Sequence, residues 1–529
     1  MRDLQLPGRS VVHAANGVAA TSHPLSTAIA IDVLRQGGTA ADAAVAACAV
    51  QCVVEPMSTG VGGDCFVLYA KAGSTKVDGL NGSGRAPAGL TVEHLQARGM
   101  KEIDISSPHA VTIPGAVDAW EKLLARHGHF GLDRLLQPAI QYAEEGFAVT
   151  PRVAVDWSRN EEKLKRDPNT AAKYLPNGRV PVPGDKLRFP ELGETLRKIA
   201  KQGRRGFYEG AVAEDIVAYL RGLGATHAMA DFAEHEAEWV EPISTAYRGR
   251  KVLQIPPNGQ GITVLLMLNI LSGFDLAGLD PVGAERLHLE AEISRLAYSV
   301  RDRYVADPSQ AAVPVAEILS ESYANDLRRR INPDRAMDIA DIYAGPVYRD
   351  TIYLTVVDRD RNVCSFINSL FHPFGSALTA PKSGVLLQNR GSGFRIEPGH
   401  PNCVAPKKRP MHTIIPGMVF EGDRPVLSYG VMGGAFQPVG HIHVLSNIFD
   451  FGMDVQEAID CARAFHLSGR FELERGIGDE TAKHLAALGH VIARPDMPWG
   501  GGQGIFIDWQ KGTLAAGSDP RKDGSALGY

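Results

Sequence analysis

The sequence predicts a soluble α+β protein, with helices concentrated in its first two-thirds and strands in its last third. Between about residues 115 and 345 the hydrophobic patterns are mostly helical, and breaks rich in proline and glycine separate them. Near residue 350 the character changes, because residues 351–358 (TIYLTVVD) are rich in β-branched and aromatic side chains. These two observations together predict the class.

The N-terminal region alternates helix and strand signals. A helix is expected over His23–Gln36, where Gly37 and Gly38 supply a C-terminal stop. Residues Thr39–Val54 are rich in alanine and almost continuously apolar, which is typical of a buried helix with closely packed neighbours. The glycine-rich segment GVGGD then predicts a loop, and Cys65–Ala70 predicts a strand.

The later elements follow from the same patterns. Residues 351–358 and Val363–Ser369 flank the turn signal DRDRN, so they predict a hairpin. Further helices are expected at Ala116–Arg126, Leu135–Glu145, Glu285–Tyr304, His441–Phe449 and Val455–Arg463, and further strands at Val385–Gln388, Ile414–Phe420 and Gly504–Trp509.

Composition and charge indicate which classes of partner, and which compartment, are expected. The 529 residues suffice for a large core; 44% are hydrophobic and 22% charged, and the formal net charge is −5. A nucleic-acid partner is not expected, because the basic surplus of such proteins is missing. The N-terminus has no apolar core of signal-peptide length, and no segment reaches the roughly 18 apolar residues of a spanning helix. We therefore expect no membrane partner and a cytoplasmic protein.

The residue types that bind metals show no matching spacing. The six cysteines form no C-x-x-C pair, so reduced and mostly buried thiols are expected at Cys48, Cys52, Cys65, Cys364, Cys403 and Cys461. His441 and His443 lie two apart in a helical pattern, so they point to different faces and structural roles are favoured. No P-loop, H-E-x-x-H or G-x-S-x-G motif is present. No cofactor and no metal are expected.

Gly433 and Gly434 follow a strand-like run, Val426–Val431, and precede a helix that starts near Pro438. Backbone amides at such a place can stabilise an oxyanion. A tight turn is the other reading, and the pattern alone leaves both open.

A series of segments, in order along nearly the whole chain, resembles the gamma-glutamyltranspeptidase family. These segments are ATSHPLSTAIAIDVLRQGGTAADAAVA, VVEPMSTGVGGDCF, VTIPGAVDAW, QPAIQYAEEGFAVTP, IPPNGQG, DTIYLTVVDRDRN, the run from Gly430 to Gly440, and GSDPRKDGSALGY.

The resemblance implies a self-processing enzyme with a four-layer αββα sandwich, the N-terminal-nucleophile hydrolase fold. Residues 1–350 would form the larger part and residues 351–529 the smaller, as one compact unit. The bond Asp350–Thr351 would be cut, so that Thr351 becomes a new N-terminus. A hydroxyl is a weak nucleophile until a base takes its proton, and the freed α-amine can do so, directly or through water.

The other catalytic roles also come from the resemblance. Ser369, eighteen residues after Thr351, matches a hydroxyl residue that hydrogen-bonds the nucleophile. Gly433 and Gly434 match the glycines whose amides hold the oxyanion. An acyl-enzyme would form on Thr351, and water or another amine would then take the acyl group.

The residues that bind the glutamyl group in the family are largely replaced here. Ser83 stands at the place of an arginine, and Arg85 follows two positions later. Phe371 stands at the place of an asparagine. Arg390 and Gly393 replace a polar residue and an amine-binding aspartate, so an ionic partner of the glutamyl ammonium group is lost. The family's paired serines fall at His412 and Thr413. The substrate-binding candidates are Arg85, Phe371, Arg390, His412 and Thr413.

Three functions stay open at this point. The first is a gamma-glutamyl hydrolase or transferase acting on glutathione-like amides. The second is an acylase or small-amide hydrolase with another acid group, such as an oxamate or a dicarboxylic monoamide. The third is an unprocessed, non-enzymatic binding protein on the same fold, against which Thr351, Ser369 and the two glycines argue. The partners expected are a small-molecule amide and the association of the two fragments of one chain, and a homodimer is left open.

Overall fold

Two seven-stranded sheets lie at the centre of the computed structural model, which describes residues 8–338 and 351–529. In spatial order the first sheet contains β1 (Val12–Ala14), β20 (Thr513–Ser518), β19 (Gly501–Asp508), β15 (Arg424–Met432), β14 (Gly417–Glu421), β9 (Arg250–Gln254) and β8 (Ile243–Tyr247). The second contains β21 (Ser525–Gly528), β2 (Val18–Thr21), β10 (Ile352–Val357), β11 (Val363–Ser369), β3 (Asp64–Ala70), β4 (Val77–Gly82) and β7 (Glu238–Val240).

Strand β10 shows why the two sheets lie face to face. Its side chains alternate: Ile352, Leu354 and Val356 join one hydrophobic cluster, whereas Tyr353 and Val357 join another. Because successive side chains of a strand point to opposite faces, the two clusters lie on opposite sides of the second sheet. The cluster of Tyr353 also contains residues of the first sheet, namely Met418, Phe420, Ile505, Ile507, Leu514 and Ala516, so it fills the space between the sheets.

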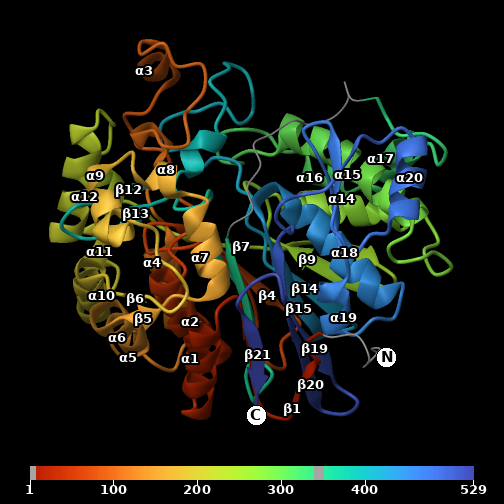
Figure 1. Ribbon diagram of the computed structural model, residues 1–529, viewed down its shortest axis with the longest axis horizontal. Coiled ribbons are helices and arrows are strands. Elements are labelled where there is room, and N and C mark those ends of the chain that lie inside the picture. The colour runs from red at the N-terminus through yellow and green to blue at the C-terminus, as the bar shows by residue number, and fades with distance from the viewer. Residues whose placement is uncertain (1–7, 339–350) are drawn as a thin grey trace.

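Helices cover the outer face of each sheet, on the two sides of Figure 1. The second sheet is covered by α1 (Pro24–Arg35), α2 (Ala40–Val54), α4 (Ala116–His127), α6 (Gln137–Glu145) and α10 (Pro190–Gln202), whose buried residues share its outer cluster. The first sheet is covered by α14 (Gly261–Leu271), α15 (Ala284–Tyr304), α18 (Gln437–Phe449) and α19 (Val455–Asp460). Each sheet therefore buries both of its faces.

The remaining elements connect or border these layers. The helices are α3 (Val92–Gln96), α5 (Leu132–Leu135), α7 (Pro151–Ser158), α8 (Glu161–Leu164), α9 (Pro168–Tyr174), α11 (Arg205–Tyr208), α12 (Ala211–Gly222), α13 (Met229–Ala233), α16 (Val315–Ile318), α17 (Glu321–Arg328) and α20 (Asp479–Ala487). The short strands are β5 (Phe147–Ala148), β6 (Lys186–Leu187), β12 (Leu378–Thr379), β13 (Leu386–Leu387), β16 (Ala464–Leu467), β17 (Arg470–Leu473) and β18 (Ile492–Ala493). No helix of the described residues is long and apolar enough to cross a membrane.

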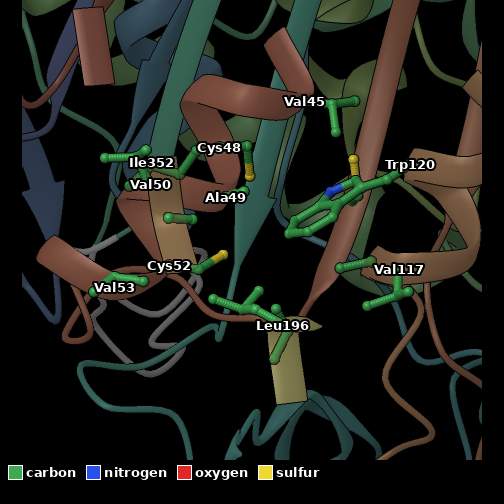
Figure 2. Packing of buried hydrophobic residues seen from close by; sticks show 14 of the residues in the cluster. Val45, Cys48, Ala49, Val50, Cys52, Val53, Val117, Trp120, Leu196 and Ile352 are labelled. Atoms are coloured by element: carbon green, nitrogen blue, oxygen red, sulfur yellow. The ribbon is translucent and has the colours of Figure 1, made fainter. Parts of the chain in front are cut away.

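Helix α2 is buried along its whole length, as its alanine-rich sequence predicts. It begins with a capping box, in which the Thr39 side chain accepts from the Asp42 amide and the Asp42 carboxylate accepts from the Thr39 amide. Small side chains such as Ala49 let it approach β10 closely, and Figure 2 shows Val50 beside Ile352 and Cys48 facing Trp120. The helix thereby backs the strand that carries the expected nucleophile.

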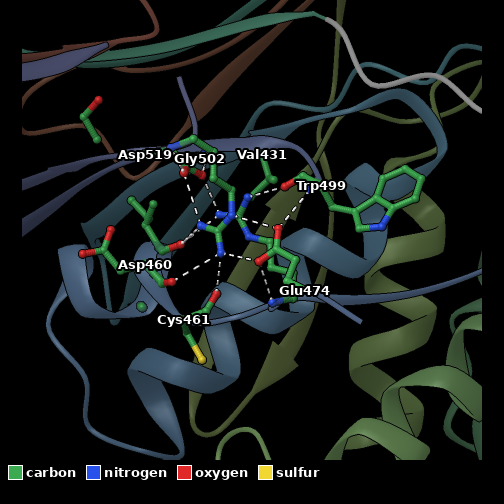
Figure 3. A network of polar contacts seen from close by, with 12 residues as sticks. Val431, Asp460, Cys461, Glu474, Trp499, Gly502 and Asp519 are labelled. Carbon is green, nitrogen blue, oxygen red and sulfur yellow. Dashed lines mark hydrogen bonds and ion pairs between the residues drawn. The ribbon is translucent and has the colours of Figure 1, made fainter. Parts of the chain in front are cut away.

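A buried ionic network ties the C-terminal segment to the first sheet. Arg463 donates to Asp519 at 2.6 Å, and Arg521 donates to Glu474 at 2.5 Å and 2.9 Å (Figure 3). Asp519 also accepts from the Gly502 amide, which lies on β19. Every charge in this network has a partner of opposite sign. The network therefore holds the C-terminal segment, residues 517–529, against the first sheet.

The predicted hairpin is confirmed by β10 and β11, which pair antiparallel with Ile352 opposite Asn368. The expectation of a mostly helical stretch from 115 to 345 was wrong at 238–254, where β7, β8 and β9 lie. Strands β8 and β9 form a hairpin whose two loop residues, Arg248 and Gly249, both have positive φ. In the sequence, this hairpin is indicated by two runs of alternating polar and apolar residues that flank Arg248 and Gly249.

The burial of Trp120 predicts how far its truncation should destabilise the protein. Trp120 is fully buried between α2 and the second sheet, so Trp120→Ala should lower the free energy of unfolding by about 3–5 kcal/mol through lost burial and a new cavity. Leu223→Ala is the matched control, because Leu223 is 44% exposed and its truncation should cost at most about 0.5 kcal/mol. Urea unfolding of the full chain measures both; equal losses would contradict this packing.

Candidate active site

The site begins at a pair of hydroxyl groups where β10 starts. Thr351 lies directly before β10, and its Oγ1 is 3.0 Å from the Oγ of Ser369, the last residue of β11. Both side chains are buried. The amide of Phe371 donates to the Ser369 Oγ at 2.9 Å, and Phe371 has a φ of 82° that turns the chain away after β11. The antiparallel register thus brings the Thr351 and Ser369 hydroxyls together.

Asp64 continues this row onto the next strand, because Ser369 pairs with Asp64 in the ladder of β11 and β3. One carboxylate oxygen of Asp64 accepts from the amides of Gly84 and Gly115, at 3.0 Å and 3.3 Å. Burial raises the pKa of Asp64 to about 7, although the Arg390 charge and these amides act in the opposite direction. The three strands β10, β11 and β3 therefore place polar groups side by side at one end of the sheet.

His412 completes the bonding of Asp64. Its Nε2 is 3.0 Å from the second Asp64 oxygen, and its Nδ1 accepts from the Ile414 amide at 3.3 Å, so the proton lies on Nε2. Burial, and then the charges of Arg390 and Arg409, hold the pKa of His412 well below its usual value. His412 is therefore a neutral donor to Asp64 and not a free base.

The glycine turn approaches from the facing sheet. Strand β15 ends at Met432, and Gly433 and Gly434 follow with φ values of 126° and 56°, which a side chain would strain. Within residues 8–338 and 351–529, neither amide donates a hydrogen bond to another residue. Gln260 fixes the turn, because its Nε2 donates both to the Gly434 carbonyl at 3.0 Å and to the Thr413 carbonyl at 2.7 Å.

A pocket of about 250 Å³ lies where these loops meet. Phe371, two residues after Ser369, borders it on one side, and Ala435, the residue after Gly434, borders it on another. The expected residues Thr413 and Gly393 also line it. Its charged lining consists of Lys101, Glu102, Arg301, Asp302 and Arg395, together with His400. The pocket is of a size for a small acyl group.

Arg390 lies behind the wall of this pocket. Its guanidinium carbon is 3.8 Å from the centre of the Phe371 ring, and its Nη1 donates to the Thr413 Oγ1 at 2.8 Å. Phe371 and Thr413 line the pocket, and Arg390 is 1% exposed. The Arg390 cation is therefore buried behind two residues of the pocket wall. It stacks on Phe371 and donates a hydrogen bond to Thr413.

Arg85 lies in a different place. It forms ion pairs with Glu238 at 2.8 Å and Asp307 at 3.3 Å, and it lines a separate hollow together with His235. Ser83 is buried, and its Oγ donates to Asn81 at 2.7 Å. Of the five substrate-binding candidates, the structure therefore brings Phe371 and Thr413 to the pocket, places Arg390 and His412 behind it, and puts Arg85 beside another hollow.

One group of described residues has the donor atoms to hold a metal ion. The ligand atoms of His288, Glu292 and His490 lie within 4.8 Å of one another. They already have partners, because His288 Nδ1 is 2.8 Å from His490 Nε2 and Glu292 forms a 2.6 Å ion pair with Arg295. These contacts explain the cluster without a metal, and it lies apart from the residues that line the Phe371 pocket.

Three residues of the site were missed by the sequence analysis: Asp64, Gln260 and Arg301. Gln260 lies in the segment IPPNGQG and Asp64 in GVGGD, which were noticed as motifs, but no pattern showed where their side chains point. Arg301 is buried on α15, and its Nη1 donates to the Gln260 Oε1 at 2.9 Å. A charged residue on the apolar face of a helical pattern was the available signal.

Comparison with known proteins identifies the family. The pattern of the family described as Gamma-glutamyltranspeptidase matches residues 26–529. The chain belongs to that family.

Individual relatives agree over nearly the whole length. The Glutathione hydrolase-like YwrD proenzyme of Bacillus subtilis is 37% identical, over 96% of this chain and 97% of that protein. The Acylase ACY 1 proenzyme of Pseudomonas sp. (strain SE83) is 32% identical, over 97% and 93% respectively. The crystal structure of a cephalosporin acylase from Bacillus halodurans superposes with a TM-score of 0.93 at 38% identity, covering 100% of this chain and 99% of that one.

This gamma-glutamyltranspeptidase-family protein is thus an enzyme, an amide hydrolase of the glutathione hydrolase-like proenzyme type with a mixed α+β fold. The predicted resemblance is confirmed. Of the two residues at the predicted cleavage site, the structure describes Thr351, whereas Asp350 lies outside the described residues.

The close packing of Gly63 gives a test of the hydroxyl pair. A Cβ at Gly63 would lie 2.4 Å from the Ser369 carbonyl oxygen, so Gly63→Ala must shift Ser369 relative to Thr351. We expect amide turnover to fall by at least about tenfold, as misplacement of a reacting group by about 1 Å can cost 100-fold. Gly278→Ala is the control, since its Cβ would meet nothing within 4 Å. Rates measured on both variants decide; unchanged turnover in Gly63→Ala would refute the positioning role of Ser369.

Proposed function

We propose that this enzyme cleaves itself before Thr351 and then hydrolyses small amides through an acyl-enzyme on the Thr351 hydroxyl. The observation that carries the proposal is the Thr351–Ser369 hydroxyl pair at 3.0 Å. Phe371, whose amide donates to the Ser369 Oγ, lines a pocket together with Ala435, the residue that follows Gly434. In this proposal the layers are those of an N-terminal-nucleophile αββα sandwich, and residues 1–350 and 351–529 are the two fragments.

The first step uses groups of this chain and one water molecule. In the precursor the Thr351 hydroxyl attacks the carbonyl of residue 350, so that the peptide bond breaks, the Thr351 α-amine is freed and an ester to the Thr351 oxygen forms. Water then hydrolyses this ester, which gives the carboxylate of residue 350 and restores the Thr351 hydroxyl. An amine with an ordinary pKa of about 7.7–8.0 is partly neutral near pH 7, so it can then act as the base for the same hydroxyl. Ser369 supports both steps, because its Oγ accepts from the Phe371 amide and is thereby held at the Thr351 Oγ1.

The oxyanion of the tetrahedral intermediate would be stabilised by the amides of Gly433 and Gly434. Gln260 holds the carbonyl side of this turn, and Arg301 holds Gln260, so the turn is fixed before substrate binds. Such preorganised donors are each worth about 2.7–4 kcal/mol of transition-state stabilisation.

The charges of the pocket favour an acyl group that carries a carboxylate. Three fixed cations line it, Lys101, Arg301 and Arg395, against two acids, Glu102 and Asp302. Asp302 is already paired with Arg301 at 2.9 Å. Gly393 contributes no charge where the family pattern has an amine-binding aspartate. We therefore place acids such as dicarboxylic monoamides first among the substrates.

One observation favours the second candidate, hydrolysis of glutathione-like gamma-glutamyl amides. The Asp302 Oδ2 is buried and accepts no hydrogen bond from any residue that the structure describes. A glutamyl ammonium group in the pocket would give this oxygen a donor, and burial already holds the pKa of Asp302 above its ordinary value, although the Arg301 charge acts against it. The glutathione hydrolase-like relative is consistent with this substrate.

Self-cleavage is the first expected outcome. Intact-mass measurement should find a C-terminal fragment that begins at Thr351 and has 179 residues, since 529 minus 350 is 179. Thr351→Ala should stay full length because the attacking hydroxyl is gone, whereas Thr351→Ser keeps a hydroxyl and should still be cut. A Thr351→Ala chain that splits at this bond would overturn the assignment of the nucleophile.

The acyl group is tested by comparing kcat/KM for glutathione with that for oxamate and dicarboxylic monoamides on processed enzyme. We expect the carboxylate-bearing monoamides to be preferred. Arg395→Gln should lower their kcat/KM about tenfold, as one charge-assisted hydrogen bond is lost. Asp302→Asn should leave the monoamide rates within about twofold and should lower only glutathione turnover, because only the glutamyl group brings an ammonium.

The role of Arg390 is tested with the same set of amide substrates, by measuring kcat/KM for each. Arg390→Ala should weaken all substrates alike, because it removes the support of Phe371 and Thr413 on the pocket wall. A loss confined to carboxylate-bearing substrates would instead show direct contact with Arg390. If glutathione is clearly preferred and Asp302→Asn abolishes that preference, the second candidate replaces the first.

A further inference from the structure

A buried carboxylate and an imidazole join the two central sheets at the end where the site lies. Asp64 begins β3 of the second sheet, and His412 lies in the loop that leads into β14 of the first. The Asp64 Oδ2 accepts from the His412 Nε2 at 3.0 Å, and both residues are fully buried. Neither of them lines the Phe371 pocket. We call this contact the Asp64–His412 bridge.

The bridge begins in the same row of side chains as the two hydroxyl groups. Ser369 pairs with Asp64 in the ladder of β11 and β3. Two residues away on the same strands, Ile367 and Phe66 belong to the hydrophobic cluster between the sheets. Because alternate side chains of a strand share a face, Ser369 and Asp64 also point into the space between the sheets. The Phe66 ring packs on the His412 ring, with centroids 4.7 Å apart, so the bridge crosses this space one strand away from Ser369.

The backbone of His412 continues this contact to the glycine turn. Its amide donates to the Asn258 carbonyl at 2.8 Å, and its carbonyl accepts from the Gln260 amide at 2.8 Å. The Gln260 Nε2 in turn donates to the Gly434 carbonyl at 3.0 Å. A series of hydrogen bonds therefore runs from Asp64 through His412 and Gln260 to the turn, and none of them is longer than 3.0 Å.

Three donors face the single carboxylate of Asp64. Besides His412, the amides of Gly84 and Gly115 donate to it, at 3.0 Å and 3.3 Å. The ionised acid suits these donors, because it only accepts hydrogen bonds. Burial nevertheless raises the pKa of Asp64 to about 7, although the Arg390 charge and the two amides act in the opposite direction. A carboxylate that is kept where burial opposes its ionisation is typical of a functional site.

We propose that the Asp64–His412 bridge sets the oxyanion turn at its working distance from the nucleophile, which makes Asp64 and His412 positioning residues of the reaction. The inference rests on the proposed function, in which the Gly433 and Gly434 amides stabilise the oxyanion formed at Thr351. Asp64 belongs to the row of the nucleophile, and His412 belongs to the loop that supports the turn. Because oxyanion donors act more strongly in the transition state than on bound substrate, a loosened bridge lowers kcat and leaves KM nearly unchanged.

Asp64→Asn breaks the bridge with little change in shape. The His412 Nδ1 accepts from the Ile414 amide, so its Nε2 carries the proton. An Asn side chain has one acceptor oxygen and one donor nitrogen, so in either orientation this nitrogen meets another donor. We expect kcat for the amide that processed wild type hydrolyses fastest to fall at least about tenfold with KM within about twofold, since misplacement by about 1 Å can cost 100-fold.

Asp215→Asn is the matched control. Asp215 is buried on α12 and accepts from the amides of Lys382 and Ser383 at 3.1 Å and 2.7 Å, so this change also removes a charge beside two backbone donors. Asp215 does not line the Phe371 pocket, and kcat should stay within about twofold of wild type. A kcat of Asp64→Asn as high as that of the control would overturn the proposal.

Two changes at His412 separate its hydrogen bond from its bulk. His412→Gln keeps an N–H donor near the place of Nε2 and should keep kcat within about threefold of wild type, whereas His412→Leu has no donor and should lose at least about tenfold. Equal kcat values in the two variants would overturn the proposal. Circular dichroism melts show whether each variant folds. If Asp64→Asn and both His412 variants fail to fold, the bridge serves folding and not turnover, and the proposal is wrong.

A double-mutant cycle tests the route through Gln260. Asp64→Asn combined with Gln260→Leu should lose at most about threefold more kcat than the more damaging single change, because both changes release the same turn. Losses that multiply would contradict this route. A wild-type chain that is not cut before Thr351, or that hydrolyses no amide, would overturn the proposed function itself. An active wild type with a fully active Asp64→Asn would overturn this inference alone.

Discussion

The insertion of β10 between β2 and β11 is the constraint on which the rest of the structure depends. Thr355, Val356 and Val357 pair with residues 18–20 on one side, and the whole strand pairs with β11 on the other. This double pairing sets the register that brings the Thr351 and Ser369 hydroxyls together. It also turns alternate side chains of β10 into the two cores, so a slip by one residue would exchange the inner and outer faces of the central strand.

Buried charge around the site supports positions more than it contacts substrate. Asp64 is held by two amides and by His412, while Arg390 stacks on Phe371 and bonds Thr413. Removing one member of such a set would leave an uncompensated buried charge, which costs several kcal/mol. The pocket wall is therefore rigid at Phe371 and Thr413, whereas the lining residues Lys101 and Arg395 are exposed.

The sequence was most informative where local chemistry determines structure. The hairpin of 351–369, helix α2 and the helix after Gly434 could be predicted from β-branched runs, alanine content and glycine punctuation. Thr351 and Ser369 were proposed from a resemblance and not from periodicity.

The direction of side chains between residues far apart in the sequence could not be predicted. Arg85 lies close to Ser83 in sequence, yet Glu238 and Asp307 draw it to another hollow. Arg390 was expected to face a substrate, yet the positive φ of Phe371 places an aromatic ring over it. Gln260 acts on residues 153 and 174 positions away, which no local pattern shows.

The insertion of β10 and β11 between the N-terminal strands β2 and β3 has a consequence for the lifetime of the molecule. An uncut chain refolds as one polymer, so its recovery after unfolding does not depend on concentration. A chain cut before Thr351 would have the two central strands of this sheet, β10 and β11, on a different polypeptide from the strands β2 and β3 that flank them. Reassembly would then be a second-order reaction between two pieces, neither of which holds a complete sheet. The mature form would persist because it unfolds slowly and not because its two pieces readily refold together. Loss of folded structure on heating should therefore be irreversible in the cut form and reversible in the uncut Thr351→Ala chain.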